Sequence, residues 1–157
     1  MADKSTRIFR VELPTRPPIS RDIEIEPGKS LYWLAEAIVR AFDFDFDHAF
    51  GFYSGKTYPK MMKEQPKYEL FADMGEQFAD KGEKTDAKSV KRTAIAEAFP
   101  RVGHAMLFLF DYGDEWLFRV KLIGSGERTA KTRYPRVIAG TGKSPVQYPD
   151  PDEEDEW

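Results

Sequence analysis

The sequence predicts a single α+β domain: a mainly antiparallel β-sheet with one amphipathic helix packed on a face and one or two short helices. Three observations support this class. Several short segments alternate between apolar and polar residues, as half-buried strands do. One segment, residues 31–42, carries apolar residues at helical spacing. Strands and helices do not alternate in the rhythm of a parallel α/β fold, so hairpin-like pairing is expected.

In the N-terminal part, residues 6–13 and 21–26 alternate and are expected to be strands. Ser30 precedes the helical segment, and its hydroxyl can accept a hydrogen bond from a backbone N–H that the helix leaves without a partner. We therefore expect Ser30 to cap a helix over residues 31–42. Residues 50–53 form another short apolar run and are predicted to be a strand.

The middle of the chain is polar over residues 56–88, which read as a long excursion from the sheet. The sequence leaves open whether this excursion is an ordered lid or a mobile loop. Thr93 is expected to cap a short helix over residues 94–99, and a further short element is expected at 134–139. We place the domain over residues 1–149.

Two apolar runs, residues 105–109 and 117–123, flank a Gly-centred acidic turn and predict a β-hairpin. The first run is apolar on both faces and is expected at the centre of the sheet. Carboxylates beside aromatic rings can hold a cation, bind an amine or share a proton. The structural alternative is that the aspartates bond their own turn and the tryptophan closes the core. The predicted functional surface comprises Asp111, Tyr112, Asp114, Trp116 and His48.

Composition excludes several classes of site and protein. Cysteine is absent, which removes disulfides, thiolate zinc sites and cysteine nucleophiles. No apolar run approaches the roughly 20 residues that span a bilayer, and the N-terminus lacks a signal-peptide core. We expect a soluble cytoplasmic protein that does not engage a membrane.

Three aspartates alternate before His48 at the spacing of a calcium loop. The glycine and the glutamate that complete such a loop are replaced by His48 and Ser54. An acidic loop with its phenylalanines in the core is favoured, no metal or cofactor is assigned, and a weak divalent site stays open. The aspartates are Asp43, Asp45 and Asp47.

Charge is segregated along the chain. Residues 150–157 carry six acids and no base and are expected to be a disordered tail, whereas the rest of the chain holds 24 bases and 21 acids. Residues 117–148 carry seven bases and one acid, which predicts a polyanion-binding surface or, alternatively, an ordinary solvated one. The bases are Arg119, Lys121, Arg128, Lys131, Arg133, Arg136 and Lys143.

The hairpin sequence Phe-Asp-Tyr-Gly-Asp-Glu-Trp, residues 110–116, resembles the Tyr-Asp-Phe-Gly-Asp-x-Trp hairpin of the plasmid pRiA4b ORF-3-like family of bacterial and archaeal proteins. The resemblance implies an α+β domain and no established activity. The chain departs from it at Phe50 and Phe118, where members often carry histidine. It departs again where Gln147, Tyr148 and Pro149 replace a terminal Cys-Gly-Gly segment.

Two functions follow from these patterns. The first is a non-catalytic binding or interaction module, associated with nucleic acid, mobile genetic elements or another protein. The alternative is a hydrolase or metal-dependent enzyme that uses the hairpin-tip carboxylates with His48. The enzyme requires residues 43–48 to lie within hydrogen-bond reach of the hairpin tip, in a cleft. A separation above about 10 Å would exclude it, because that is too far for a shared metal or a proton relay.

Overall fold

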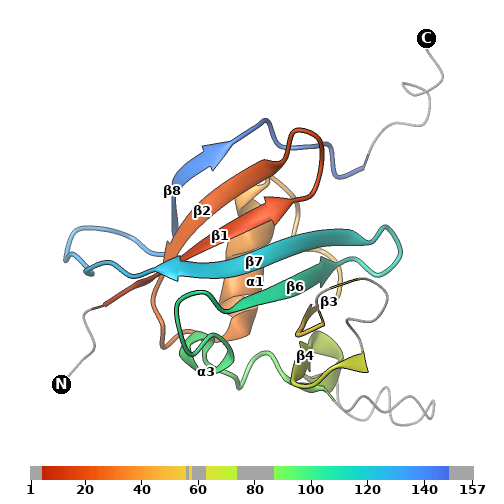
Figure 1. Ribbon diagram of the computed structural model, residues 1–157, viewed down its shortest axis with the longest axis horizontal. Coiled ribbons are helices and arrows are strands. Elements are labelled where there is room, and N and C mark those ends of the chain that lie inside the picture. Colours follow the sequence, from red (N-terminus) through yellow and green to blue (C-terminus); the bar gives the residue numbers. More distant parts are fainter. Residues whose placement is uncertain (1–4, 56, 58–62, 74–86, 149–157) are drawn as a thin grey trace.

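The computed structural model describes residues 5–55, 57, 63–73 and 87–148. Within them, eight strands form one sheet in the order β5-β4-β3-β6-β7-β1-β2-β8 (Figure 1). The strands are β1 (Arg7–Leu13), β2 (Ile19–Ile25), β3 (Phe50–Tyr53), β4 (Lys67–Glu69), β5 (Lys88–Ser89), β6 (Ala105–Phe110), β7 (Trp116–Gly124) and β8 (Arg136–Thr141). The helices are α1 (Leu31–Ala41), η2 (Leu70–Asp73) and α3 (Ile95–Ala98). Only β4 and β5 pair in parallel, so the predicted α+β class with a mainly antiparallel sheet is confirmed.

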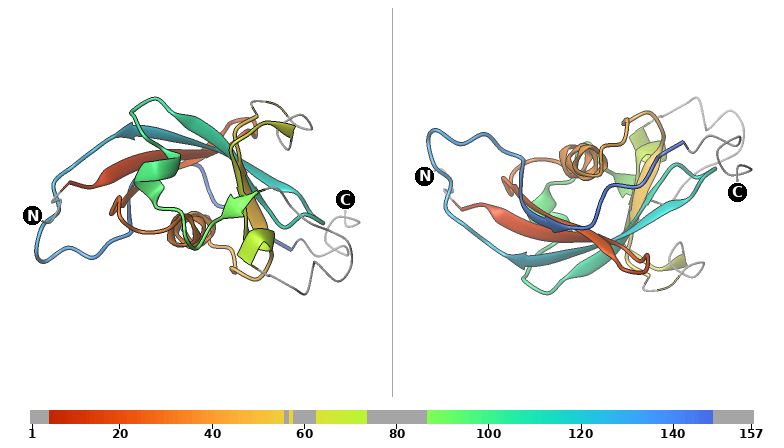
Figure 2. Two further views of the ribbon diagram at one scale, coloured as in Figure 1. Left: turned by 90° about the horizontal axis from the view of Figure 1, so that it is seen from below. Right: turned by 90° about the horizontal axis from the view of Figure 1, so that it is seen from above.

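The sheet curls around α1, which lies along its concave side (Figure 2). The helix buries one face because its apolar residues recur at helical spacing. Beside it, Phe99, which follows α3, packs edge-on against Phe9 of β1 with ring centroids 4.8 Å apart. The main core therefore lies between the sheet and the two helices. The buried residues of α1 are Leu31, Leu34, Ala35, Ile38 and Val39.

Strand β6 is apolar on both faces because both faces are covered. Phe108 and Phe110 belong to the main core beneath the helices. Leu107 and Leu109 pack with Tyr53 in a smaller cluster on the opposite face. Since β6 lies between β3 and β7, its predicted place inside the sheet is confirmed.

The acidic residues of β2 point to the outer face of the sheet, yet they are covered. Asp22 is 8% exposed and Glu24 is 4% exposed. Arg10 of β1 donates two hydrogen bonds of 3.0 Å to Asp22, and Arg136 of β8 donates one of 2.8 Å to Glu24. The Thr6 hydroxyl also donates to Glu24. Charge pairs therefore join β2 to both of its neighbours.

The predicted cap of α1 is in the right position but lacks its hydrogen bond, and the predicted cap of α3 is wrong. Ser30 is the N-cap residue of α1, but its side chain makes no capping hydrogen bond. Instead, the carbonyl of Thr93 accepts from the N–H of Leu31 at 2.9 Å. The Thr93 hydroxyl donates to the carbonyl of Ser89, and Ala94 is the N-cap residue of α3. A neighbouring loop, rather than a local side chain, supplies the partner at the start of α1.

Three segments lack a clear apolar pattern in the sequence, and the predictions for them compare differently with the structure. Part of the excursion over residues 56–88 is ordered, because β4 pairs with β3 and β5 pairs with β4. Residues 56, 58–62 and 74–86 of the excursion and the acidic tail, residues 150–157, lie outside the described residues. The short element expected at 134–139 is strand β8, displaced toward the C-terminus. In the described part of the chain, no helix is long and apolar enough to cross a membrane.

Candidate functional site

The hairpin tip between β6 and β7 is held by the side chain of Asp111. Its Oδ1 accepts hydrogen bonds from the N–H groups of Gly113 at 3.0 Å and Asp114 at 3.2 Å. Asp111 has a φ of +67°, in the left-handed region that aspartate and asparagine tolerate better than most residues. The residue is only 5% exposed. One oxygen of Asp111 therefore serves the turn itself, as the structural alternative predicts.

Residues 43–48 lie beside the hairpin tip because aromatic side chains anchor them there. Phe44 packs edge-on against Trp116, with ring centroids 4.7 Å apart. Phe46 stacks near Phe110, the last residue of β6, at 6.2 Å. Both phenylalanines occupy the core positions that the sequence predicts. Core packing thus brings the acidic loop and the tip together.

The C-terminal segment returns to the same loop. The side-chain amide of Gln147 accepts from the N–H of Asp45 at 2.7 Å and donates to its carbonyl at 3.1 Å. The hydroxyl of Tyr148 donates to Asp47 Oδ2 at 2.8 Å. Sequence reasoning assigned no role to Gln147 or Tyr148, because about 100 residues separate them from the loop. The signal available was the departure from the family pattern at this segment.

His48 lies at the centre of these groups. Its Nδ1 is 2.7 Å from Asp47 Oδ1 and 3.0 Å from the hydroxyl of Tyr148. Its Nε2 is 3.6 Å from Asp111 Oδ2, well inside the separation of about 10 Å that would exclude the enzyme hypothesis. The exposed carboxylate of Asp114 also acts electrostatically on the ring. We call Asp47, His48, Asp111, Asp114 and Tyr148 the His48 cluster.

The cluster changes the titration of its own members. The hydrogen bond to Asp47 and the charges of Asp111 and Asp114 raise the pKa of His48, outweighing partial burial. Burial would raise the pKa of Asp47, yet hydrogen bonds with Tyr148 and His48 lower it. Burial and the bond to Asp47 raise the pKa of Tyr148 to about 12. The cluster therefore favours an ionised Asp47 beside a protonated His48.

Tyr112, although predicted to share this surface, packs with the smaller cluster on the opposite face of the sheet. Its hydroxyl is 2.7 Å from that of Tyr53, which in turn donates to Glu69. Burial raises the pKa of both tyrosines. A Cβ on Gly51 would lie 2.7 and 2.8 Å from the two hydroxyl oxygens, so glycine leaves room for them.

Trp116, also predicted to line the site, packs against the main core. Its indole Nε1 is buried and has no hydrogen-bond partner among the described residues. The ring closes the end of the core through Phe44, as the structural alternative expects. Of the five predicted residues, the structure brings together His48, Asp111 and Asp114.

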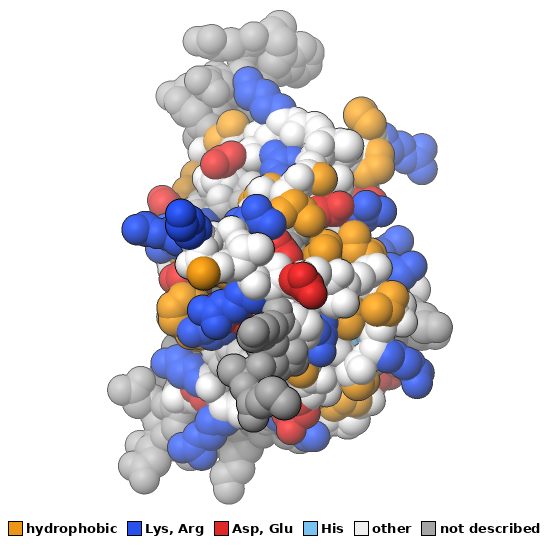
Figure 3. All heavy atoms as spheres, turned by 90° about the vertical axis from the view of Figure 1, so that its left-hand side faces the viewer, with side chains coloured by type: hydrophobic (Ala, Val, Ile, Leu, Met, Phe, Trp, Pro, Cys, Tyr) orange, Lys and Arg blue, Asp and Glu red, His pale blue; other side chains and the backbone are white. Residues whose placement is uncertain are grey.

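The predicted polyanion-binding residues differ in their surroundings. Arg136 and Arg128 form ion pairs with Glu24 and Glu26, at 2.7 and 3.4 Å. Figure 3 looks at the end of the molecule where β7 finishes, and its basic side chains are scattered among acidic and hydrophobic ones. The remaining bases are exposed on β7 or on the segments before and after β8: Arg119, Lys121, Lys131, Arg133 and Lys143.

The alternating aspartates do not converge on a cation. Within the residues that the structure describes, no group of three or more His, Asp or Glu side chains could hold a metal ion. Asp43 accepts a hydrogen bond of 2.7 Å from Ser144, whereas Asp47 faces His48. The side chains of Asp43 and Asp47 therefore have different partners.

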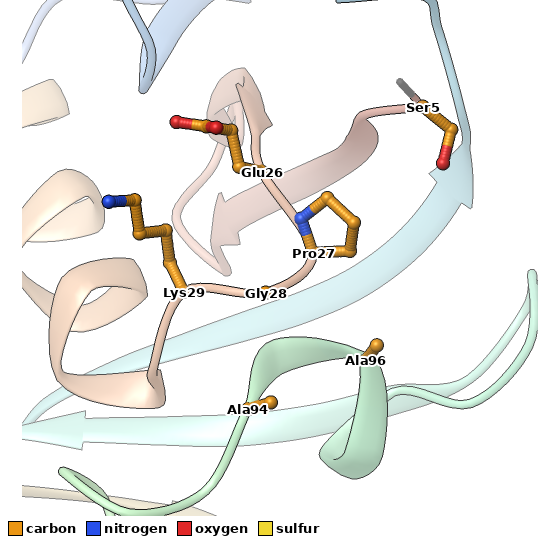
Figure 4. A pocket seen from close by; sticks show the side chains of 7 residues that line it. All are labelled: Ser5, Glu26, Pro27, Gly28, Lys29, Ala94 and Ala96. Atoms are coloured by element: carbon orange, nitrogen blue, oxygen red, sulfur yellow. The ribbon is translucent and has the colours of Figure 1, made fainter. Parts of the chain in front are cut away.

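A hollow of about 520 Å³ lies between the turn at Pro27 and helix α3 (Figure 4). Small side chains such as Ala94 and Ala96 border it. In Figure 4 the carboxylate of Glu26 extends away from these alanines, and it lies 3.4 Å from Arg128. The hollow contains none of the predicted site residues.

Comparisons with known proteins agree with this architecture. The fold is similar to that of a solved protein of unknown function, MM3350 from Methanosarcina mazei Go1. The match has a TM-score of 0.68 at 20% identity and covers 88% of this chain and 71% of that chain. No curated protein matches the sequence. Residues 6–148 match the model of the plasmid pRiA4b ORF-3-like protein family, and the chain therefore belongs to that family.

Proposed function

We propose that this protein is a non-catalytic binding module whose recognition surface is the His48 cluster. The observation that carries the proposal is that the groups a catalyst would use already face one another. Both ring nitrogens of His48 lie next to groups of the protein itself. The two carboxylate oxygens of Asp111 likewise lie next to protein groups: Oδ1 next to the N–H groups of the turn, and Oδ2 next to His48. A general base needs a nitrogen or oxygen directed at its substrate. His48 Nδ1 and Asp111 Oδ1 are instead already hydrogen-bonded within the protein.

The exposed charge of the cluster indicates the chemistry of the partner. The side chain of Asp47 is 43% exposed, and Asp114 at the hairpin tip is exposed as well. These carboxylates favour a cationic group, such as an arginine or lysine side chain of another protein. They would repel the phosphates of a nucleic acid. A protein partner is therefore favoured over nucleic acid at this surface.

The proposal is tested by titrating the purified protein with a short arginine-rich peptide in a calorimeter. We expect Asp114→Asn to weaken binding several-fold, because one exposed carboxylate is lost. Asp45→Asn is the matched control: Asp45 is also exposed and lies in the loop beside the hairpin tip, but it is not part of the cluster. Equal weakening by both variants, or no binding to the native protein, would contradict the proposal.

The enzyme alternative is favoured by one distance, the 3.6 Å between His48 Nε2 and Asp111 Oδ2. It predicts turnover of an ester or phosphoester by the native protein and loss of that turnover in His48→Gln. If such turnover is found and the variant unfolds at the same temperature as the native protein, hydrolysis replaces binding as the function.

A further inference from the structure

At the other end of the β6–β7 hairpin, a second hollow of about 650 Å³ opens on the protein surface. Its wall includes Arg101 and His104 from the segment before β6, and Arg119 and Lys121 from β7. We call the space lined by these four residues the basic hollow. It lies where β6 begins, whereas the His48 cluster lies where β6 ends.

The basic hollow is held by the sheet rather than by a loose loop. Gly103, at a φ of +97°, donates its N–H to the carbonyl of Leu122 at 2.8 Å. The N–H of Leu122 donates to the carbonyl of His104 at 3.0 Å. Arg119 and Lys121 are alternate residues of β7 and are both exposed, so they share the outer face. Backbone pairing therefore fixes both sides of the wall.

The charges in the hollow have no partners inside the described structure. Arg101, Arg119 and Lys121 form no ion pair or hydrogen bond through their side chains with any described residue. Of the described residues that line the space, none is acidic. The neighbouring strand places Glu12 opposite Arg119 and Arg10 opposite Lys121. Three cations therefore face one opening, with a single carboxylate on the adjacent strand.

The floor of the basic hollow and the ring of His104 provide apolar surface that a ligand could contact. Ala105 and Leu107 of β6 stand beside the two bases of β7 in the strand register and line the hollow. The ring of His104 packs edge-on against Phe99 at 5.5 Å. Burial and the charge of Arg101 lower the pKa of His104, which favours a neutral ring near pH 7. A ligand here would meet cations on the wall and an apolar surface beneath.

We propose that the basic hollow binds the phosphate group of a nucleotide-sized ligand. Small-molecule sites commonly occupy about 300–1,000 Å³ and combine apolar walls with a few convergent polar groups. Guanidinium and ammonium groups are the usual partners of phosphate, and two arginines can bind it through paired N–H donors. This site is separate from the His48 cluster and does not depend on the function proposed for that cluster.

The test measures binding of inorganic phosphate, ATP and a short oligothymidylate to the full chain by calorimetry at about 50 mM salt. The test variant is Arg119→Gln/Lys121→Gln. The matched control is Arg133→Gln/Lys131→Gln, which removes the same residue types from exposed positions outside the hollow. No ion pair or hydrogen bond to a described residue is lost in either pair, so we expect the melting temperature to change little.

We expect ATP to bind the native protein and the test variant to bind it at least about tenfold more weakly, with the control unchanged. If the oligothymidylate alone shows that pattern, the phosphate comes from a nucleic-acid backbone and the site still stands. Equal weakening in both variants would identify diffuse charge attraction and overturn the proposal. Absence of binding by all three probes would overturn it too.

Discussion

The two ends of the β6–β7 hairpin carry opposite charge, and they use it differently. In the His48 cluster, acidic groups bond the hairpin turn, the histidine and a tyrosine from the C-terminal segment. In the basic hollow, three cations have no side-chain partner among the described residues. Charge at the tip is therefore part of what holds the fold together. Charge at the other end is free for a ligand.

The two histidines of the chain report this difference. His48 lies among carboxylates, which raise its pKa through the bond to Asp47 and the charges around it. His104 is partly buried beside Arg101, and both influences lower its pKa. The same side chain is thus pushed toward the charged form at one end of the hairpin and toward the neutral form at the other.

The largest expected effect on stability comes from a substitution at the hairpin tip. Asp111→Ala removes the acceptor for two backbone N–H groups and places alanine in a left-handed conformation. We expect it to lower the free energy of unfolding by about 3 kcal/mol, measured by urea denaturation. Asp111→Asn keeps an acceptor and tolerates that conformation, so its loss should be below about 1 kcal/mol. Similar losses in the two variants would show that the charge, not the turn, matters.

The next largest effect is on the pH dependence of stability, to which the histidines at the two ends of the hairpin contribute with opposite sign. The raised pKa of His48 adds stability that is fully present below the ordinary histidine pKa of about 6.5 and is lost as pH rises through the raised value. The lowered pKa of His104 adds stability that is present above about 6.5 and is lost as pH falls through the lowered value.

These signs are checked with His48→Gln and His104→Gln. Relative to the native protein, His48→Gln should be less stable at about pH 5 than at about pH 8. His104→Gln should show the reverse, because acidification no longer charges a partly buried ring. Nuclear magnetic resonance titration of the two imidazoles gives an independent reading. A higher pKa for His104 than for His48 would refute the assignment of charge to the two ends.

The smallest effect is at the basic end. Lys121 lies opposite Arg10 across β1 and β7, so Lys121→Glu replaces a like-charge neighbour with an opposite one. We expect an increase in stability of a few tenths of a kcal/mol together with loss of ATP binding. A destabilisation as large as that of Asp111→Ala would mean that Lys121 holds the sheet, and the contrast between the two ends would fail.

Local patterns were sufficient to predict most of the fold. A few neighbouring residues are enough to show which side chains of these elements must be buried. The patterns are the apolar alternation in β1 and β2, the helical spacing in α1 and the apolar residues on both faces of β6. Ser30 is the N-cap residue as predicted, but the carbonyl of Thr93, distant in sequence, accepts from the N–H of Leu31, a contact that no local rule contains. The position of β8 was displaced because all its residues are exposed and leave no apolar pattern.

The site was harder to predict than the fold. The proximity of His48 and Asp111 could be suspected, since both flank buried aromatic residues. The separation of Tyr112 from Asp111 could not, because the turn directs these adjacent side chains to different surroundings. The ion pairs within the predicted basic surface could not be predicted either, for a related reason. Two of its bases pair with acids of β2 and of the turn after it, which lie far away in sequence.

The strand order also bears on how the chain folds during its synthesis. Strand β1 is made early, yet its second neighbour is β7, so the chain from Leu13 to Trp116 must emerge before that edge of β1 is paired. At about 5–20 residues per second, a ribosome needs on the order of 5–20 s for this stretch. Until then, the backbone N–H and C=O groups along that edge of β1 stay unpaired in water. Such a nascent chain is a natural client for a chaperone.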